Sequence, residues 1–309
     1  MCIFAANRTT MAINYKEVRN DRQWKASTGL SEEQFFTLVK MFGEAYEQLF
    51  GVSMVDRQNN STNESTFKTY EDLLFFSLYS LKSGLTYDLL GLTFGLDGAN
   101  AYQNQALGLR VLRAALEHGG HMPKRACQSM EEFKEQWANE GEILIDATEQ
   151  RRQRPGNQQD QKEDYSGKKK AHTLKFLILA NGKKRIKFLS EAYPGSAHDY
   201  AILKSELPEE ENIWFDEHYL HVDLGFLGGK DYPALEISIP FKKSKNKPLT
   251  EDHKIINKQR SSIRVTVEHS IGGLKRFRFL SDRLRCRDIQ LYNLVAGVCA
   301  GLWNFCLTD

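Results

Sequence analysis

The segment EILIDAT at residues 142–148 decides the fold, because it is an apolar run that contains one carboxylate, Asp146. It is too short for a helix and polar residues flank it, which indicates a buried β-strand. Residues 172–180 and 185–192 predict two further strands. The pair Asn181-Gly182 between them predicts a two-residue hairpin turn.

The chain downstream of these strands alternates between strand and helix patterns. Strands are predicted at 221–226, which runs into a loop, and at 237–241, and helices at 199–207, 257–277 and 288–307. This order predicts an α/β domain over residues 141–309, with a mixed sheet flanked by helices in a layout that resembles ribonuclease H.

Upstream of residue 141 the pattern is helical. Residues 30–50 predict a helix that Ser31 caps with Gln34 three residues later, and the polar residues 55–65 predict a loop. The region is divided into a helical part with its loop at 1–69, a helix-turn-helix region at 70–122 and a polar connector with an amphipathic middle at 123–140.

The helix-turn-helix prediction depends on residues 86–118. A short helix is stopped by Gly95, and a longer helix begins at Asp97 or Gly98. One polar face of the longer helix carries amide side chains, which are natural readers of adenine edges: Asn100, Gln103 and Asn104. An ordinary helical hairpin with a solvated face is the alternative interpretation.

Positive charge is concentrated in two blocks, although the net charge of the 309 residues is only +2. Residues 151–187 contain twelve Lys/Arg and three Asp/Glu, and residues 241–287 contain fourteen and four. Such blocks suit a surface that neutralises phosphates, and solvated strand or helix faces are the alternative.

The sequence predicts a soluble, intracellular protein, in the cytoplasm or nucleoid of a bacterium or the nucleus of a eukaryote. Residues 1–10 lack the pattern of a secretion signal. The most apolar stretch, 291–307, is interrupted by Asn293 and Asn304 and suits a buried terminal helix better than a membrane span. The five cysteines form no CxxC pair and no zinc-ligand spacing, which fits a reducing compartment.

Three carboxylates stand at positions that suggest chemistry. Asp146 and Asp223 each follow an apolar strand pattern, and a carboxylate there is costly to bury unless it is paired or bound to metal. Glu268 shares a helical stripe with Arg264 and Lys275. The alternatives are turn or capping aspartates and an Arg264–Glu268 surface ion pair worth less than about 1 kcal/mol.

Two adjacent glycines interrupt the same predicted helix. Gly272-Gly273 costs on the order of 2 kcal/mol against alanine in a helix. We expect this cost to mark a close approach of the backbone to the sheet or to DNA.

Four ordered motifs resemble the Harbinger-related branch of DDE transposases, which also includes bacterial insertion sequences. They are DATE at 146–149, GSAHD at 195–199, DLGF at 223–226 and R…VE…LK over 264–275. The segment LTYDLLGL at 85–92 is similar to the helix-turn-helix that precedes the catalytic domain in this family. Ala147 and Phe226 depart mildly from the family pattern, which has Gly and Tyr there.

The resemblance implies a ribonuclease H-like catalytic domain whose triad and metal ligands are Asp146, Asp223 and Glu268. Asp199 is the runner-up for the second carboxylate, although its place at a helix start is typical of a cap. Three carboxylates suit Mg²⁺ or Mn²⁺, with two ions in the mechanism expected for the cutting of DNA strands and their transfer to target DNA.

DNA is the expected partner, at both element ends and target, and a homo-oligomer is expected on it. Candidate phosphate contacts are Lys168, Lys169, Lys170, Arg264 and Lys275. The alternatives are a catalytically silent DNA-binding relative, a nuclease that does not join strands, and a structural protein whose carboxylates do not converge.

Overall fold

The computed structural model describes residues 12–60, 65–208, 214–226, 232–241 and 249–307. It divides into two compact units. The helical unit comprises residues 1–119 and 277–279, and the sheet unit comprises residues 120–276 and 280–309. No helix in the described part of the chain is both long and apolar enough to cross a membrane.

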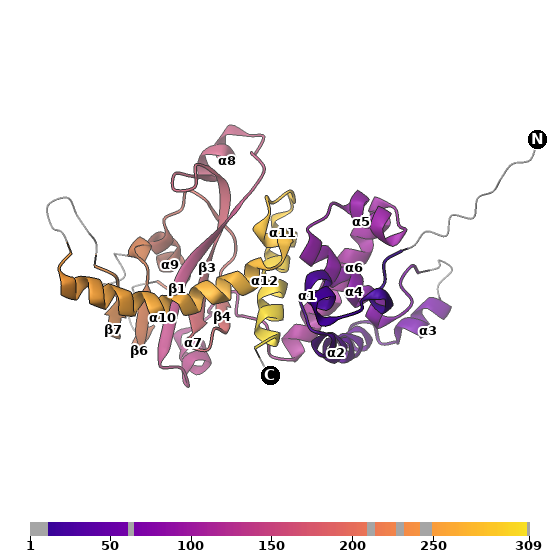
Figure 1. Ribbon diagram of the computed structural model, residues 1–309, viewed down its shortest axis with the longest axis horizontal. Helices are drawn as coiled ribbons and strands as arrows, with labels where there is room; N and C mark the ends of the chain where they lie inside the picture. Colours follow the sequence, from indigo (N-terminus) through magenta and orange to yellow (C-terminus); the bar gives the residue numbers. More distant parts are fainter. Residues whose placement is uncertain (1–11, 61–64, 209–213, 227–231, 242–248, 308–309) are drawn as a thin grey trace, which may run out of the picture. The chain divides into compact units, whose positions relative to one another are not determined.

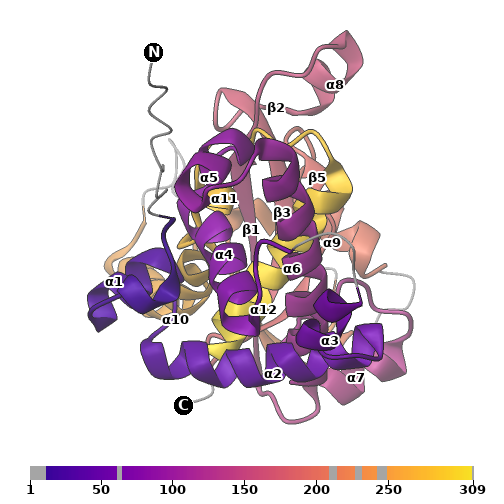
Figure 2. The same cartoon turned by 90° about the vertical axis from the view of Figure 1, so that its right-hand side faces the viewer.

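The helical unit is built around α2, α4 and α6, which pack together, with α2 lying across the ends of the other two (Figure 2). Its elements are η1 (Tyr15–Glu17), α1 (Asp21–Ser27), α2 (Glu32–Phe50), α3 (Met54–Asn59), α4 (Tyr70–Ser83), α5 (Tyr87–Phe94) and α6 (Gly98–His118). The predicted cap of α2 is confirmed: Ser31 and Gln34 form a capping box.

The junction between α5 and α6 follows the sequence signals. Gly95 ends α5 in the left-handed conformation, with φ +70°. The Asp97 carboxylate then accepts a hydrogen bond of 2.7 Å from the Asn100 backbone N–H, so α6 begins at Gly98.

The loop predicted for residues 55–65 is wrong over its first part, where α3 forms. Ser53 caps this helix by accepting from the Asp56 backbone N–H at 3.1 Å, and the backbone N–H of buried Met54 donates to the Tyr70 hydroxyl at 3.1 Å. A polar helix with one apolar anchor has no periodic pattern to reveal it. Residues 61–64 of the predicted loop lie outside the described residues.

The sheet unit contains a mixed sheet in the order β2-β3-β1-β6-β7, with β4 and β5 also paired to β3. Its elements are α7 (Met130–Trp137), β1 (Glu142–Arg151), α8 (Gln158–Glu163), β2 (Tyr165–Ser166), β3 (Ala171–Asn181), β4 (Ile186–Leu189), β5 (Tyr193–Pro194), α9 (Asp199–Glu206), β6 (Phe215–Val222), β7 (Ala234–Ser238), α10 (Glu251–Lys275) and α12 (Ile289–Phe305). The short α11 (Arg278–Ser281) spans the division between the units. β1 runs antiparallel to β3 and parallel to β6, which is itself parallel to β7. This arrangement is compatible with a ribonuclease H-like domain.

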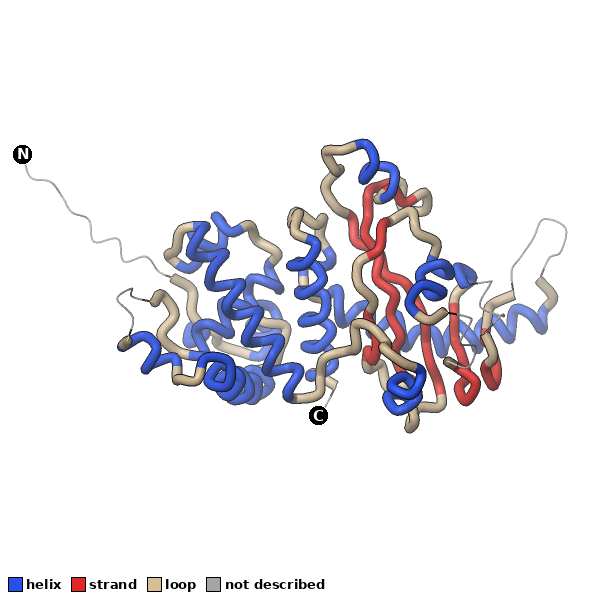
Figure 3. The backbone as a smooth tube through the Cα atoms, turned by 180° about the vertical axis from the view of Figure 1, so that it is seen from behind, coloured by secondary structure: helices blue, strands red, loops and turns tan. Residues whose placement is uncertain are grey.

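Helices cover both faces of the sheet. α10 crosses one face, and α7 and α9 lie on the other (Figures 1 and 3). On the α7/α9 face, Phe133 and Trp137 pack with Ile202 and with apolar strand side chains such as Ile143. The predicted terminal helix is confirmed as α12, and most of its residues are buried.

Two local predictions in the sheet unit need correction. The hairpin after β3 forms, but its loop has three residues, because Asn181 pairs with Arg185 and the left-handed residue is Lys184, with φ +67°. At the glycine pair the close neighbour is a helix and not the sheet: a Cβ on Gly273 would lie 2.1 Å from the Trp303 ring of α12, whereas a Cβ on Gly272 would meet no protein atom within 4 Å.

Part of the sequence evidence lies outside the described residues, namely Cys2, residues 1–10 and residues 242–248 of the second basic block. None of the four described cysteines forms a disulfide bond.

Candidate active site

The register of two parallel strands brings Asp146 and Asp223 to the same level. The last pair between β1 and β6 is Ile145 with Val222; Asp146 is the next residue of β1, and Asp223 is the first residue after β6. β1 does not end near residue 148 as predicted; it runs to Arg151, because its residues continue to pair with β3. Asp146 therefore projects from the middle of a strand, beyond the point where β6 ends.

Asp146 faces α10, because side chains alternate along a strand and Ile143 and Ile145 face the α7/α9 core. Arg264 of α10 reaches two of the predicted carboxylates. Its guanidinium donates to Asp223 Oδ1 at 3.1 Å and to Glu268 Oε1 at 3.2 Å. The Glu268 side chain is 52% exposed.

The Asp146 carboxyl is held in an environment that disfavours its negative charge. Burial, helped by repulsion from Asp223 and Asp199, raises its pKa to about 6. The backbone N–H of Ala147, which donates at 2.7 Å, and the charge of Arg264 act in the opposite direction. A carboxyl whose pKa is raised by burial and by neighbouring carboxylates is typical of functional sites.

Asp199 does not cap α9 as predicted. His198 stands at the cap position, and Asp199 instead accepts a hydrogen bond of 2.9 Å from the Lys175 ammonium. A buried ammonium needs a nearby anion, and this demand outweighs the weak preference for a cap. Asp199 also abuts the turn after β6, since a Cβ on Gly225 would lie 2.9 Å from its Oδ2.

Lys175 organises a buried charged cluster that the sequence analysis missed. Its ammonium donates to the Ala197 carbonyl at 2.7 Å and lies 3.7 Å from Glu149, whose carboxylate accepts from the Thr173 hydroxyl at 2.9 Å. Glu149 and Lys175 are direct partners across β1 and β3. The available signal was one lysine inside the apolar strand at 172–180.

Two of the predicted phosphate contacts, Lys169 and Lys275, lie close enough for their charges to repel each other. Lys275 donates to the Glu149 carbonyl at 2.8 Å, and burial together with the charge of Lys169 lowers its pKa. Lys168, Lys169 and Lys170 form an exposed turn between β2 and β3. The amide residues Asn100, Gln103 and Asn104 belong to α6 in the helical unit.

The donor set suits a hard divalent cation, because all of the predicted ligands are carboxylate oxygens. Among the described residues, no three His, Cys, Asp or Glu side chains lie close enough together to hold a metal ion. The Arg264 guanidinium instead bridges Asp223 and Glu268. The chain thus neutralises these carboxylates with its own cation.

Comparison with known proteins identifies the family. The family model for the DDE superfamily endonuclease matches residues 145–304, more than half of the chain. The chain is also similar to a probable transposase for insertion sequence element IS702 from Microchaete diplosiphon, at 24% identity over 92% of this chain and 94% of that protein. No solved structure matches the chain. The chain belongs to the DDE superfamily endonucleases.

Proposed function

We propose that this chain is a transposase that cuts DNA strands at the ends of its own element and joins them to target DNA. Family membership and the likeness to a probable transposase support transposase-type activity. The observation that carries the finer proposal is the register of β1 and β6, with Asp146 and Asp223 following paired residues. Arg264 provides the link from Asp223 to Glu268.

In this proposal Asp146, Asp223 and Glu268 hold Mg²⁺ or Mn²⁺, most simply two ions. When bound, the metal supplies activation of the attacking oxygen and stabilisation of the leaving oxygen. The raised pKa of Asp146 supports a metal role, because a nearby cation would relieve the unfavourable charge. Arg264 would exchange its carboxylate partners for a DNA phosphate once a divalent ion neutralises them.

Asp223 is preferred to Asp199 as the second ligand. Asp199 already has a buried ammonium partner in Lys175, whereas the Asp223 partner is the partly exposed Arg264. Asp199 instead packs against the turn that begins at Asp223, where Gly225 lies close to its carboxylate.

We assign DNA contact to three further groups. Lys275 and the exposed lysines 168–170 supply positive charge for phosphates, and the α5–α6 segment of region 70–122 acts as a helix-turn-helix. Two ends must be held for joining, so a homo-oligomer on DNA belongs to the proposal. A mass measurement that finds one protomer per paired-end complex would refute this part.

The test is strand cutting by the purified full chain on duplex DNA that carries the element's ends, with Mg²⁺ or Mn²⁺. We expect metal-dependent cutting and joining by the wild type and no detectable cutting by Asp146→Asn. Asp252→Asn is the matched control, because Asp252 is an exposed carboxylate in the first turn of α10. Cutting without joining would favour a nuclease, and end binding without cutting would favour a silent relative.

A further inference from the structure

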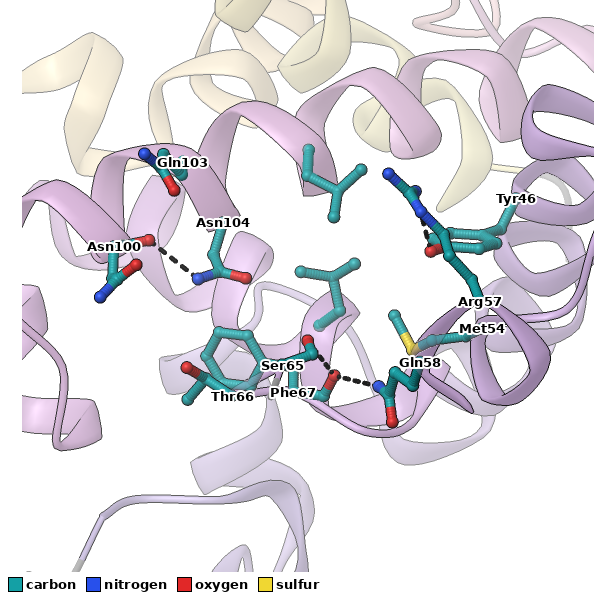
Figure 4. A pocket seen from close by; sticks show the side chains of 12 residues that line it. Tyr46, Met54, Arg57, Gln58, Ser65, Thr66, Phe67, Asn100, Gln103 and Asn104 are labelled. Atoms are coloured by element: carbon teal, nitrogen blue, oxygen red, sulfur yellow. Dashed lines mark hydrogen bonds between the residues drawn. The ribbon is translucent and has the colours of Figure 1, made fainter. Parts of the chain in front are cut away.

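The helical unit contains a hollow of about 470 Å³ that is separate from the carboxylate site. It lies between the start of α6, the helix α3 and the segment 65–67, all outside the residues matched by the family model (Figure 4). Its apolar lining includes the buried Phe67 and Leu73 and the half-buried Leu107. Such a volume suits one flat aromatic ligand with its polar groups.

A fixed cation stands at one side of this hollow. The Arg57 guanidinium lies 4.1 Å from the centre of the Phe50 ring and donates to the Tyr46 hydroxyl at 3.1 Å. Within the described residues it forms no ion pair with a carboxylate. Aromatic groups therefore position the Arg57 guanidinium, a group that pairs well with a phosphate.

Asn104 faces Arg57 across the hollow and presents an acceptor. Its amide nitrogen donates to the Asn100 carbonyl at 2.8 Å, so its oxygen is the atom directed into the hollow (Figure 4). The amide nitrogen of Gln58 is likewise used by the Phe67 carbonyl, at 2.9 Å. One N–H of each amide is thus engaged within the protein, and the Asn104 oxygen offers an acceptor to a ligand that donates a hydrogen bond.

We propose that this hollow binds one unstacked DNA base that carries an exocyclic amino group, with Arg57 on the adjoining phosphate. Adenine and cytosine share this donor, whereas thymine has a carbonyl in its place. Asn104 is only half-buried and recessed, unlike the exposed Asn100 and Gln103, so it suits an extruded base better than a base edge within a duplex groove. This proposal rests on the proposed function, which makes DNA the substrate.

The test is the binding of the full chain to two fluorescent thymidine 15-mers without divalent metal. In one of them the central thymine is replaced by cytosine, which exchanges the C4 carbonyl for an amino group, turns N3 from a donor into an acceptor and lacks the C5 methyl group. We expect the wild type to bind the cytosine probe about fivefold more tightly, the effect of one hydrogen bond. Asn104→Leu should abolish this preference, and Asn59→Leu, an exposed amide of α3 outside the hollow, should retain it.

A second variant keeps the proposal testable if Asn104→Leu fails to fold, as judged by thermal melting. Leu107→Trp fills the hollow from the half-buried side of α6 and should also remove the preference. Equal binding of both probes by wild type, or a preference that survives in a folded variant, would overturn the proposal. Cutting at element ends is scored separately, so loss of the base preference and loss of the proposed function are distinguishable.

Discussion

The helical unit and the sheet unit differ in what they bury. The buried polar side chains described in the helical unit are all uncharged, namely Thr28, Ser77, Ser80 and Gln105. The sheet unit buries the side chains of Lys175 and Asp164 and holds Glu149 and Asp199 largely out of solvent. Buried ions are expensive without partners, so we expect the sheet unit to depend on a few charge contacts and the helical unit on local signals and apolar packing.

The largest effect on stability is expected from Lys175→Met. Removing the ammonium leaves Asp199 and Glu149 in a poorly solvated cluster, and should lower the free energy of unfolding by about 3–5 kcal/mol. Urea unfolding followed by tryptophan fluorescence measures this, because Trp137, Trp214 and Trp303 belong to the sheet unit.

Lys134→Met is the matched control for Lys175→Met. The Lys134–Asp216 pair spans 3.2 Å, and both side chains are about one-third exposed. Its loss should cost less than about 1 kcal/mol. Similar losses in the two variants would contradict the claim that buried charge contacts distinguish the sheet unit.

The second prediction concerns pH and Asp146→Asn. Because folding raises the pKa of Asp146 from 3.8 to about 6, the ionised carboxyl destabilises the folded state above pH 6, and this cost disappears as pH falls below 3.8. Asp146→Asn should therefore be more stable than wild type at pH 8, by about 3 kcal/mol. Free energies of unfolding at pH 8 and pH 4, without divalent metal, measure the difference.

Added Mg²⁺ provides the counter-test for Asp146→Asn. It should raise the stability of the wild type, since a ligand that binds only the folded state stabilises it, and should affect Asp146→Asn much less. A variant that is no more stable than wild type at pH 8 would show that Asp146 carries no unfavourable charge.

The third prediction separates the two adjacent glycines of α10. Gly273→Ala drives a methyl group into the Trp303 ring, whose indole N–H donates to the Lys184 carbonyl at 2.8 Å. We expect a loss of about 1–3 kcal/mol from overpacking. Gly272→Ala meets open space and should stabilise the helix by about 1 kcal/mol. Thermal melting distinguishes the two signs, and a shared sign would refute the assignment.

The smallest effect is expected in the helical unit, from Ser31→Ala. This change removes the capping box of α2 and should cost about 1 kcal/mol. Thr86→Ala is the control, because the Thr86 side chain makes no capping hydrogen bond. Hydrogen exchange of the first-turn amides of α2 and α5 measures both effects. Faster exchange in the Thr86→Ala variant alone would contradict the claim that the Ser31 cap stabilises its helix.

The helical unit and the sheet unit also differ in how much of each could be predicted from the sequence. The helical unit has short-range signals, so Ser31, Gly95 and Asp97 located helix ends correctly, whereas α3 was missed because only Met54 anchors it. In the sheet unit the strand patterns were visible, but the end of β1 depends on its pairing with β3, which is a long-range property.

In the candidate site, too, local motifs revealed the residues but not the long-range contacts between them. The three candidate carboxylates stand in recognisable motifs, but their relation depends on strand register and on Arg264, which no local pattern encodes. Asp199 looked like a cap because its partner Lys175 is 24 residues away. Local sequence could propose these residues but could not pair them.

The most direct test of the central claim compares Asp223→Asn with Asp199→Asn in metal-dependent cutting of element-end DNA. If Asp223 is the metal ligand beside Asp146, cutting by Asp223→Asn should be undetectable. Asp199→Asn should weaken cutting by about ten- to a hundredfold, as expected for a residue that supports a ligand without binding metal. Undetectable cutting by Asp199→Asn, with substantial cutting by Asp223→Asn, would contradict the assignment drawn from the strand register.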